Sequence, residues 1–236
     1  MLYVHELHEV IGAREEAFEA AFRDGWLRAL AAEDGARLLY FLHHAHGSGP
    51  SYNVVTVTAV RDANAWQRLV QRLGEGDLVD WARQVDALRH DVDAKILLPL
   101  PWSPRQELDL ASVPTDAREH PLSLFMEDTV WPHEGKLDAY IERSGSHYLA
   151  EMRANAERRS TLLEIQGGFR TAFGSGRRRE IVLWQKVVEP RALRPLLTRE
   201  VPQEFKRPGT WMHDALSLRD RWQSKLLRSS AWSPLW

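Results

Sequence analysis

The chain has 236 residues, of which 44% are hydrophobic and 27% charged, the composition of an ordinary globular protein. Its 31 Lys and Arg residues nearly balance 33 Asp and Glu residues, and the resulting charge of −2 disfavours binding to nucleic acid or to an anionic membrane. The absence of cysteine excludes disulfides, cysteine-ligated metals and a cysteine nucleophile. Because no apolar run approaches the roughly 18 residues of a membrane helix, and the N-terminus lacks a signal-peptide pattern, we expect a soluble cytoplasmic protein.

The first half of the chain predicts the order strand, helix, strand, strand, helix, strand. Residues Leu2–Val10 mix β-branched, aromatic and polar side chains, as strands do. Residues Ala13–Ala32 have apolar side chains at helical spacing. Two further strands, Arg37–His44 and Tyr52–Val60, are separated by a glycine-containing hairpin segment. A second helical pattern then leads to a last strand over Lys95–Leu100.

The second half repeats the residues and the order of the first. Leu2-Tyr3-Val4 matches Leu124-Phe125-Met126, and the set Trp81, Leu88, Arg89, Lys95 and Trp102-Ser103-Pro104 recurs 130 residues later, ending in Trp232-Ser233-Pro234. We expect a helix over Lys136–Arg158, a helix that contains Trp211, Ala215, Leu218 and Trp222, and a strand over Lys225–Arg228. A repeat of this length indicates two copies of one supersecondary unit.

Two tandem ferredoxin-like βαββαβ units of the α+β class follow from this order. Each unit covers one face of its sheet with helices, so the two bare faces are expected to pack sheet to sheet as a pseudo-dimeric α/β barrel with a cavity between them. We place the first unit at residues 1–104, a proline-containing linker at 105–122 and the second unit at 123–236.

The run Asn53-Val-Val-Thr-Val-Thr-Ala-Val-Arg-Asp62, followed by a helix, resembles the third strand of NIPSNAP-type proteins of the dimeric α/β-barrel superfamily. The second copy has Ile181-Val-Leu-Trp-Gln-Lys-Val-Val-Glu-Pro190 at that place. The tyrosine that is typical late in this strand is replaced by Val60 or Lys186. The resemblance implies a ligand cavity and a superfamily that contains cofactor-free monooxygenases, polyketide cyclases, isomerases, haem enzymes and non-catalytic NIPSNAP proteins; it implies no single reaction.

Candidate site residues in the first half lie on its strands. His5 and His8 are three residues apart on a strand and therefore point to opposite faces, which argues against a shared metal ion. The resemblance implies that Tyr3 and His5 face the barrel, and His5 is the best candidate for a polar cavity residue that acts as a general base. We expect Tyr3 and His44 to contact substrate, although the alternative for His44 is a solvated strand end.

Polar residues among apolar neighbours mark the strands of the second half. By the register of the resembling family, Trp184 and Lys186 line the cavity, and Glu127 is a further substrate contact. Lys186 and Glu164 are candidate catalytic residues; the alternative is that they form a structural ion pair across the sheet. His147 would be a haem ligand only if the protein is one of the haem enzymes that the resemblance includes.

The leading hypothesis is therefore a small-molecule enzyme that performs cofactor-independent acid–base chemistry, of monooxygenase, cyclase or isomerase type, on an aromatic or polyketide-like substrate. A haem-dependent enzyme is the first alternative. A non-catalytic NIPSNAP-type binding protein is the second, and a barrel without a cavity of about 300 Å³ would favour it. We expect no metal and no cofactor, no nucleic-acid or membrane partner, and a possible homodimer.

Overall fold

The computed structural model describes residues 1–32, 35–157, 162–176 and 178–236. Its eight strands form one closed antiparallel barrel in the order β1-β3-β2-β8-β5-β7-β6-β4. The fold is therefore α+β, as predicted. The strands are β1 (Leu2–Val10), β2 (Ala36–His44), β3 (Asn53–Val60), β4 (Arg89–Pro99), β5 (Leu124–Trp131), β6 (Leu163–Phe173), β7 (Ile181–Val187) and β8 (Arg221–Ser229).

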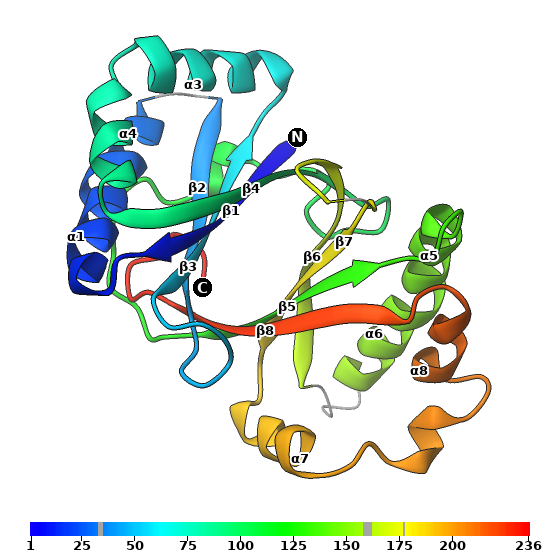
Figure 1. Ribbon diagram of the computed structural model, residues 1–236. Coiled ribbons are helices and arrows are strands. Elements are labelled where there is room, and N and C mark those ends of the chain that lie inside the picture. Colours follow the sequence, from blue (N-terminus) through cyan, green and yellow to red (C-terminus); the bar gives the residue numbers. More distant parts are fainter. Residues whose placement is uncertain (33–34, 158–161, 177) are drawn as a thin grey trace.

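The helices lie outside the barrel, in two groups on opposite sides (Figure 1). Among the described residues, no helix combines the length and the apolar character that crossing a bilayer requires. The first group is η1 (Gly12–Arg14), α1 (Glu15–Ala20), η2 (Ala21–Trp26), α2 (Leu27–Ala31), α3 (Ala63–Glu75) and α4 (Val79–Asp86). The second is α5 (Leu137–Arg143), η4 (Ser144–Tyr148), α6 (Leu149–Glu157), η5 (Pro190–Ala192), α7 (Leu193–Thr198), η6 (Gln203–Lys206), α8 (Trp211–Asp214) and η7 (Ala215–Ser217).

The barrel closes through strand edges. Strand β2 pairs with β8, where His43 is opposite Arg228, and β4 pairs with β6, where Leu97 is opposite Thr171. Because every strand then has two hydrogen-bonded neighbours, the barrel has no open edge. All eight residues of β3 are buried, since one of its faces meets the barrel interior and the other meets the helices.

Three apolar clusters follow from this layout. One fills the barrel and includes Tyr3, Phe169 and Trp184. The other two lie between the strands and the helices of each half, around Trp26 in the first and Trp211 in the second. Each half therefore has space for a pocket on the outer face of its strands, in addition to the barrel interior.

Several predicted elements are confirmed, and some differ. The predicted hairpin of β2 and β3 is present. The structure also shows that Asp62 caps α3 by accepting a hydrogen bond from the Ala65 N–H at 2.8 Å. The last strand of each half is longer than predicted. The helix expected to contain Trp222 is wrong: it ends before Leu218, and Trp222 lies on β8, because the tight turns α8 and η7 replace a long helix there. Residue 158, the predicted end of the helix before β6, lies outside the described residues.

The segment between the halves packs against the apolar cluster of the barrel. Its short turn η3 (Leu110–Ser112) is buried at Leu110, and Val113 follows as another buried residue of the barrel cluster. The segment is thus packed against both halves. The division into units at 1–104 and 123–236 stays a prediction.

Candidate functional site

The barrel interior holds a buried charge network that joins the two halves. His5 Nε2 lies 2.7 Å from Glu127 Oε2, and Lys225 Nζ donates to Glu127 Oε1 at 3.1 Å. His5 and Glu127 are 3% and 1% exposed, so this carboxylate has almost no contact with solvent. Burial alone would raise the pKa of Glu127, but His5 and Lys225 outweigh burial and hold this pKa well below its usual range.

His44 lies at the edge of this network. Burial is the main cause that lowers its pKa, and the Lys225 charge lowers it further, while Glu127 acts in the opposite direction. Neither ring nitrogen of His44 has a hydrogen-bond partner among the described residues. His44 is thus a half-buried imidazole close to the charged pair, which does not match the alternative of a solvated strand end; its predicted contact with substrate stays a prediction.

Aromatic side chains fill the space beside the network. The Trp184 ring is stacked near His5 with centroids 6.4 Å apart, and Tyr3 packs edge-on against Phe169 at 4.8 Å. The cavity in this part of the barrel, which Trp184 and Glu127 line, has a volume of about 10 Å³, enough for about one water molecule. The expectation of a ligand-sized cavity at these predicted residues is therefore wrong, because aromatic and charged side chains occupy the space.

The remaining predicted residues are elsewhere. Lys186 Nζ donates to the main-chain oxygen of Trp236 at 2.9 Å and lies over that indole ring. Glu164 is opposite Lys186 in the strand register, but it is exposed and lines a surface pocket with Pro104. The structure thus brings together His5, Glu127, Trp184 and Tyr3, with His44 nearby, and places Lys186 and Glu164 outside this group.

His147 lies outside the barrel interior and does not line the neighbouring pocket of the second half. It lies half-buried on η4, and its ring packs against Trp211 with centroids 6.2 Å apart. Trp211 lines the neighbouring pocket, whereas His147 is not among the residues that line it. A haem ligand must direct a ring nitrogen at an open cavity, and His147 lines none of the pockets described above, so this residue does not fit the role of a haem ligand. Among the described residues, no group of three or more His, Asp or Glu is suited to a metal ion.

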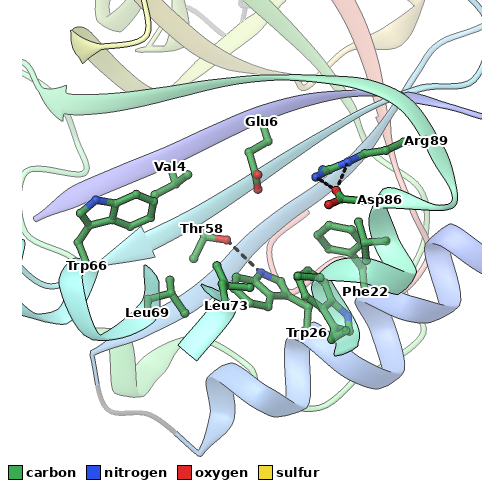
Figure 2. A pocket seen from close by; sticks show the side chains of 13 residues that line it. Val4, Glu6, Phe22, Trp26, Thr58, Trp66, Leu69, Leu73, Asp86 and Arg89 are labelled. Atoms are coloured by element: carbon green, nitrogen blue, oxygen red, sulfur yellow. Dashed lines mark hydrogen bonds and ion pairs between the residues drawn. The ribbon is translucent and has the colours of Figure 1, made fainter. Parts of the chain in front are cut away.

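Of the pockets outside the barrel, one in each half combines an acidic residue of the first strand with an arginine that follows the last helix. The second-half pocket has a volume of about 390 Å³, within the range of small-molecule sites. The first-half pocket has about 160 Å³ and is shown in Figure 2. The second-half pocket is lined by Asp128, Val130, Tyr140, Tyr148, Leu183, Lys206, Trp211, Met212, His213, Leu216, Arg219 and Trp222.

Asp128 is the acidic group of the second-half pocket. Its Oδ1 accepts a hydrogen bond from Ser224 Oγ at 2.5 Å, and its Oδ2 accepts one from Gln185 Nε2 at 3.0 Å. Gln185 in turn accepts from the Tyr148 hydroxyl, which fixes the direction of the amide. Burial raises the pKa of Asp128 above its usual range, although the hydrogen bonds from Ser224 and Gln185 oppose that effect. Asp128 is therefore a stronger base than an ordinary aspartate.

Arg219 is the buried basic group of the same pocket, which Lys206 and His213 also line. It is 8% exposed, its guanidinium carbon lies 4.2 Å from the centroid of the Trp222 ring, and its Nε has no acceptor within the described residues. Burial is the main cause that raises the pKa of Tyr140 to about 12, while the charge of Arg219 and a hydrogen bond to it act against burial. A buried guanidinium with an unused donor favours an anionic or strongly accepting ligand.

The first-half pocket has an equivalent acid and arginine, and it has a second acid, Asp86, in addition. Glu6 on β1 has the place that Asp128 has on β5, and Arg89 has the place of Arg219. Arg89, however, donates to Asp86 Oδ1 at 3.1 and 2.5 Å, so its charge is already compensated. The position that matches Asp86 in the second half is Leu216, which leaves Arg219 without that carboxylate. The two pockets are therefore complementary to different ligands.

Sequence reasoning missed both pockets although the repeat contained their signal. The matched positions of the two halves pair an acid on the first strand, Glu6 or Asp128, with an arginine that follows the last helix, Arg89 or Arg219. What the sequence did not reveal is that these positions face the helices rather than the barrel interior.

No family model matches the sequence, and no curated protein matches it. Solved structures with similar folds include a candidate monooxygenase from Lactobacillus acidophilus, with a TM-score of 0.61 at 8% identity over 99% of this chain and 96% of that one. An anthrone oxidase-like protein has a TM-score of 0.59 at 8% identity, over 97% and 91% of the two chains. A NIPSNAP domain protein from Burkholderia xenovorans matches 44% of this chain and 99% of its own, with a TM-score of 0.38 at 18% identity. At these identities the likeness to these structures is one of fold alone.

Proposed function

We propose that this chain is a small-molecule enzyme that removes a proton from an acidic organic substrate, and that the reaction takes place in the second-half pocket. The observation that carries the proposal is that Asp128, a base strengthened by burial, and Arg219, a buried cation with an unused donor, line the same 390 Å³ pocket. Proton transfer to a positioned carboxylate and stabilisation of the resulting anion are the two requirements of such a step.

In the proposed step, Asp128 accepts a proton either from a carbon atom next to a carbonyl group or from a phenol hydroxyl. The electron pair left on the substrate becomes an enolate or phenolate, and Arg219 stabilises its oxygen. Gln185 and Ser224 hold the carboxylate in place through the hydrogen bonds described above. Trp211 and Trp222 supply apolar wall for an aromatic or polyketide-like substrate.

This deprotonation is the common first step of isomerisation, cyclisation and cofactor-independent oxygenation, and we propose that it uses no cofactor, because side chains alone supply the base and the anion-stabilising group. Fold neighbours described as a candidate monooxygenase and as anthrone oxidase-like support the aromatic substrate class by analogy only. We also propose that the two halves are tandem copies of one βαββαβ unit, since both have the strand order 4-1-3-2 within the barrel. A homodimer and a cytoplasmic location stay predictions.

The test uses phenylpyruvate, an aromatic 2-oxo acid whose enolisation is followed by ultraviolet absorbance. The wild-type chain is expected to accelerate enolisation, and Asp128→Asn is expected to reduce the rate about 100-fold or more. Asp138→Asn, which removes an exposed carboxylate from the adjacent helix α5, is the matched control and should retain the rate. An Asp128→Asn variant as fast as wild type would refute the proposal.

Two further variants distinguish this proposal from the sequence-based hypothesis that the reaction takes place inside the barrel. His5→Asn and Lys186→Met should leave kcat within about threefold if the second-half pocket is the site, because neither residue lines it. Loss of turnover in both, with Asp128→Asn unaffected, would return the site to the barrel.

The second candidate is non-catalytic ligand binding, which the filled barrel interior favours. It predicts that phenylpyruvate binds in calorimetry without enolisation. The haem alternative predicts a Soret band with stoichiometric iron after addition of hemin, and absorption spectra of the same sample before and after that addition test it.

A further inference from the structure

We infer that the first-half pocket is a binding site for a small organic cation, such as an alkylammonium group. This site is separate from the one proposed above and does not depend on it. It lies between the outer face of β1 and β3 and the helical segments η2, α3 and α4. Its residues are Val4, Glu6, Phe22, Trp26, Thr58, Trp66, Leu69, Leu73, Trp81, Ala82, Val85, Asp86 and Arg89.

Aromatic rings form much of the pocket wall. Trp26 and Trp81 are stacked with centroids 4.5 Å apart, and Phe22 meets Trp81 edge-on at 5.3 Å. The indole N–H of Trp26 donates to Thr58 Oγ1 at 3.2 Å, and that of Trp81 donates to the Ala21 carbonyl at 2.9 Å. Because these donors are already used and the two rings cover one face of each other, the indoles offer the pocket only their remaining ring surface, which attracts a cation through its π electrons.

A carboxylate points into this aromatic enclosure. Figure 2 shows the Glu6 side chain extending from β1 toward Thr58 and Leu73, with Trp66 on one side and Arg89 on the other. Glu6 accepts one hydrogen bond in the described part of the chain, from Thr56 Oγ1 at 3.3 Å. Burial is the main cause that raises the pKa of Glu6, and the charge of Asp86 raises it further. The charge of Arg89, the hydrogen bond from Thr56 and the charge of His5 lower this pKa in part.

The neighbouring cation is already engaged. Arg89 Nε and Nη2 donate to Asp86, and Arg89 Nη1 lies 2.8 Å from His8 Nδ1. Arginine is always a donor, so Nδ1 of His8 is the acceptor, and this buried imidazole is held neutral: burial first, and then the Arg89 charge, lower its pKa well below the usual range. The proton on His8 Nε2 then points to Thr56 Oγ1 at 3.0 Å, which leaves the Thr56 hydroxyl proton for Glu6.

The charge balance therefore favours a cation. When Glu6 is ionised, Glu6 and Asp86 contribute two negative charges and Arg89 one positive charge, while His8 is neutral; a bound cation would favour that ionised form, which burial alone disfavours. The surplus negative charge is then at Glu6, because Arg89 is paired with Asp86, and most of the remaining wall is apolar. A buried carboxylate without its own counter-charge is costly there. An ammonium group of the ligand would supply that counter-charge, and its alkyl groups would contact the indoles. The volume of about 160 Å³ limits the ligand to a small one.

Choline and its neutral isostere 3,3-dimethylbutan-1-ol are a matched pair of probes for this site. We expect choline to bind the full chain with a Kd of about millimolar or tighter, and the isostere to bind at least about tenfold more weakly. Calorimetry measures both affinities. The indole N–H signals of Trp66, Trp26 and Trp81, assigned by substitution among the ten tryptophans, should shift with choline.

Glu6→Gln is expected to weaken choline binding about tenfold or more and to leave the weak binding of the isostere unchanged. Asp80→Asn, which removes an exposed carboxylate from the same helix α4 outside the pocket, is the matched control and should bind choline as wild type does. Should Glu6→Gln fail to fold, Trp66→Leu tests the same site, and it should abolish the preference for choline. Equal affinity for choline and the isostere, or no binding of choline or trimethylammonium at about 20 mM, would overturn the inference.

Discussion

The imidazole of His5 and the carboxylate of Glu127 lie 2.7 Å apart in the barrel interior, although 122 residues separate them in the chain. Lys225, from the last strand, completes the group at 3.1 Å from the same carboxylate. Three strands, β1, β5 and β8, thus meet through one buried charge, which links the two halves at the centre of the fold. Because His5 and Glu127 have almost no contact with solvent, we expect this group to stabilise the fold rather than to bind a ligand.

Glu127→Gln should lower the free energy of unfolding by about 3–5 kcal/mol at neutral pH, because it leaves Lys225 as a buried charge without its partner. Chemical denaturation at pH 7 measures the loss. Leu122→Ala, at an exposed position just before β5, is the control and should stay close to wild type. A loss below about 1 kcal/mol for Glu127→Gln would contradict a structural role for the network.

The same carboxylate predicts the direction of pH dependence. Because the folded-state pKa of Glu127 is lowered, its contribution to stability is present above the ordinary glutamate value of about 4.3 and is lost as the pH falls toward the lowered pKa. Denaturation at a series of pH values should therefore show the wild type approaching Glu127→Gln as the pH falls below about 4. A constant difference between the two down to pH 2 would refute this assignment.

Asp128→Asn should have the opposite effect on stability. The folded-state pKa of Asp128 is raised, so its contribution is greatest below the ordinary aspartate value of about 3.9 and is lost as the pH rises through the raised pKa. The variant, which no longer has a carboxylate to ionise in the pocket, should gain stability relative to wild type between pH 4 and pH 8. Thermal melts of the variant and the wild type at pH 4 and pH 8 test this. A variant that loses stability relative to wild type as the pH rises would count against a raised pKa of Asp128.

Gly168→Ala should destabilise the second half of the barrel by about 1–3 kcal/mol. A Cβ at Gly168 would lie 2.6 Å from the Trp102 ring, which also packs against Gly145 on η4 and bonds to the Ile141 carbonyl. Trp102 therefore needs a residue without a side chain on β6. Gly74→Ala is the matched control: no atom lies within 4 Å of its added Cβ on helix α3, and it should stabilise by about 0.5–1 kcal/mol. Urea denaturation of both variants gives the comparison.

Lys186→Met should change the free energy of unfolding by less than about 1 kcal/mol. The ammonium group bonds to the main-chain oxygen of Trp236 at the end of the chain and does not form part of the buried network. Denaturation of the variant beside Glu127→Gln compares the two charged positions directly. A loss as large as that of Glu127→Gln would show that Lys186 has a further structural role.

Much of the architecture could be predicted from the sequence because the signals are local and repeated. Hydrophobic spacing located β1, β2, β3 and the long helical segment after Gly12, and the recurrence of Trp81 and Arg89 as Trp211 and Arg219 indicated that the two halves share one element order. Alternation along β1 also separated His5 from His8 correctly, since strand positions an odd number of residues apart face opposite sides: His5 contacts Glu127 in the barrel, and His8 contacts Phe18 on helix α1.

Only the tertiary structure decided where a ligand has room. Whether a barrel is hollow depends on how far Trp184, Phe169 and Tyr3 reach across it from different strands, and a single sequence does not contain those distances. The same holds for Arg89 and Arg219: the sequence makes them equivalent, but the contact with Asp86 in one half and the absence of a matching acid at Leu216 in the other give them different chemistry. Element order follows from local periodicity, whereas pocket volume and charge balance arise from contacts between residues far apart in the chain.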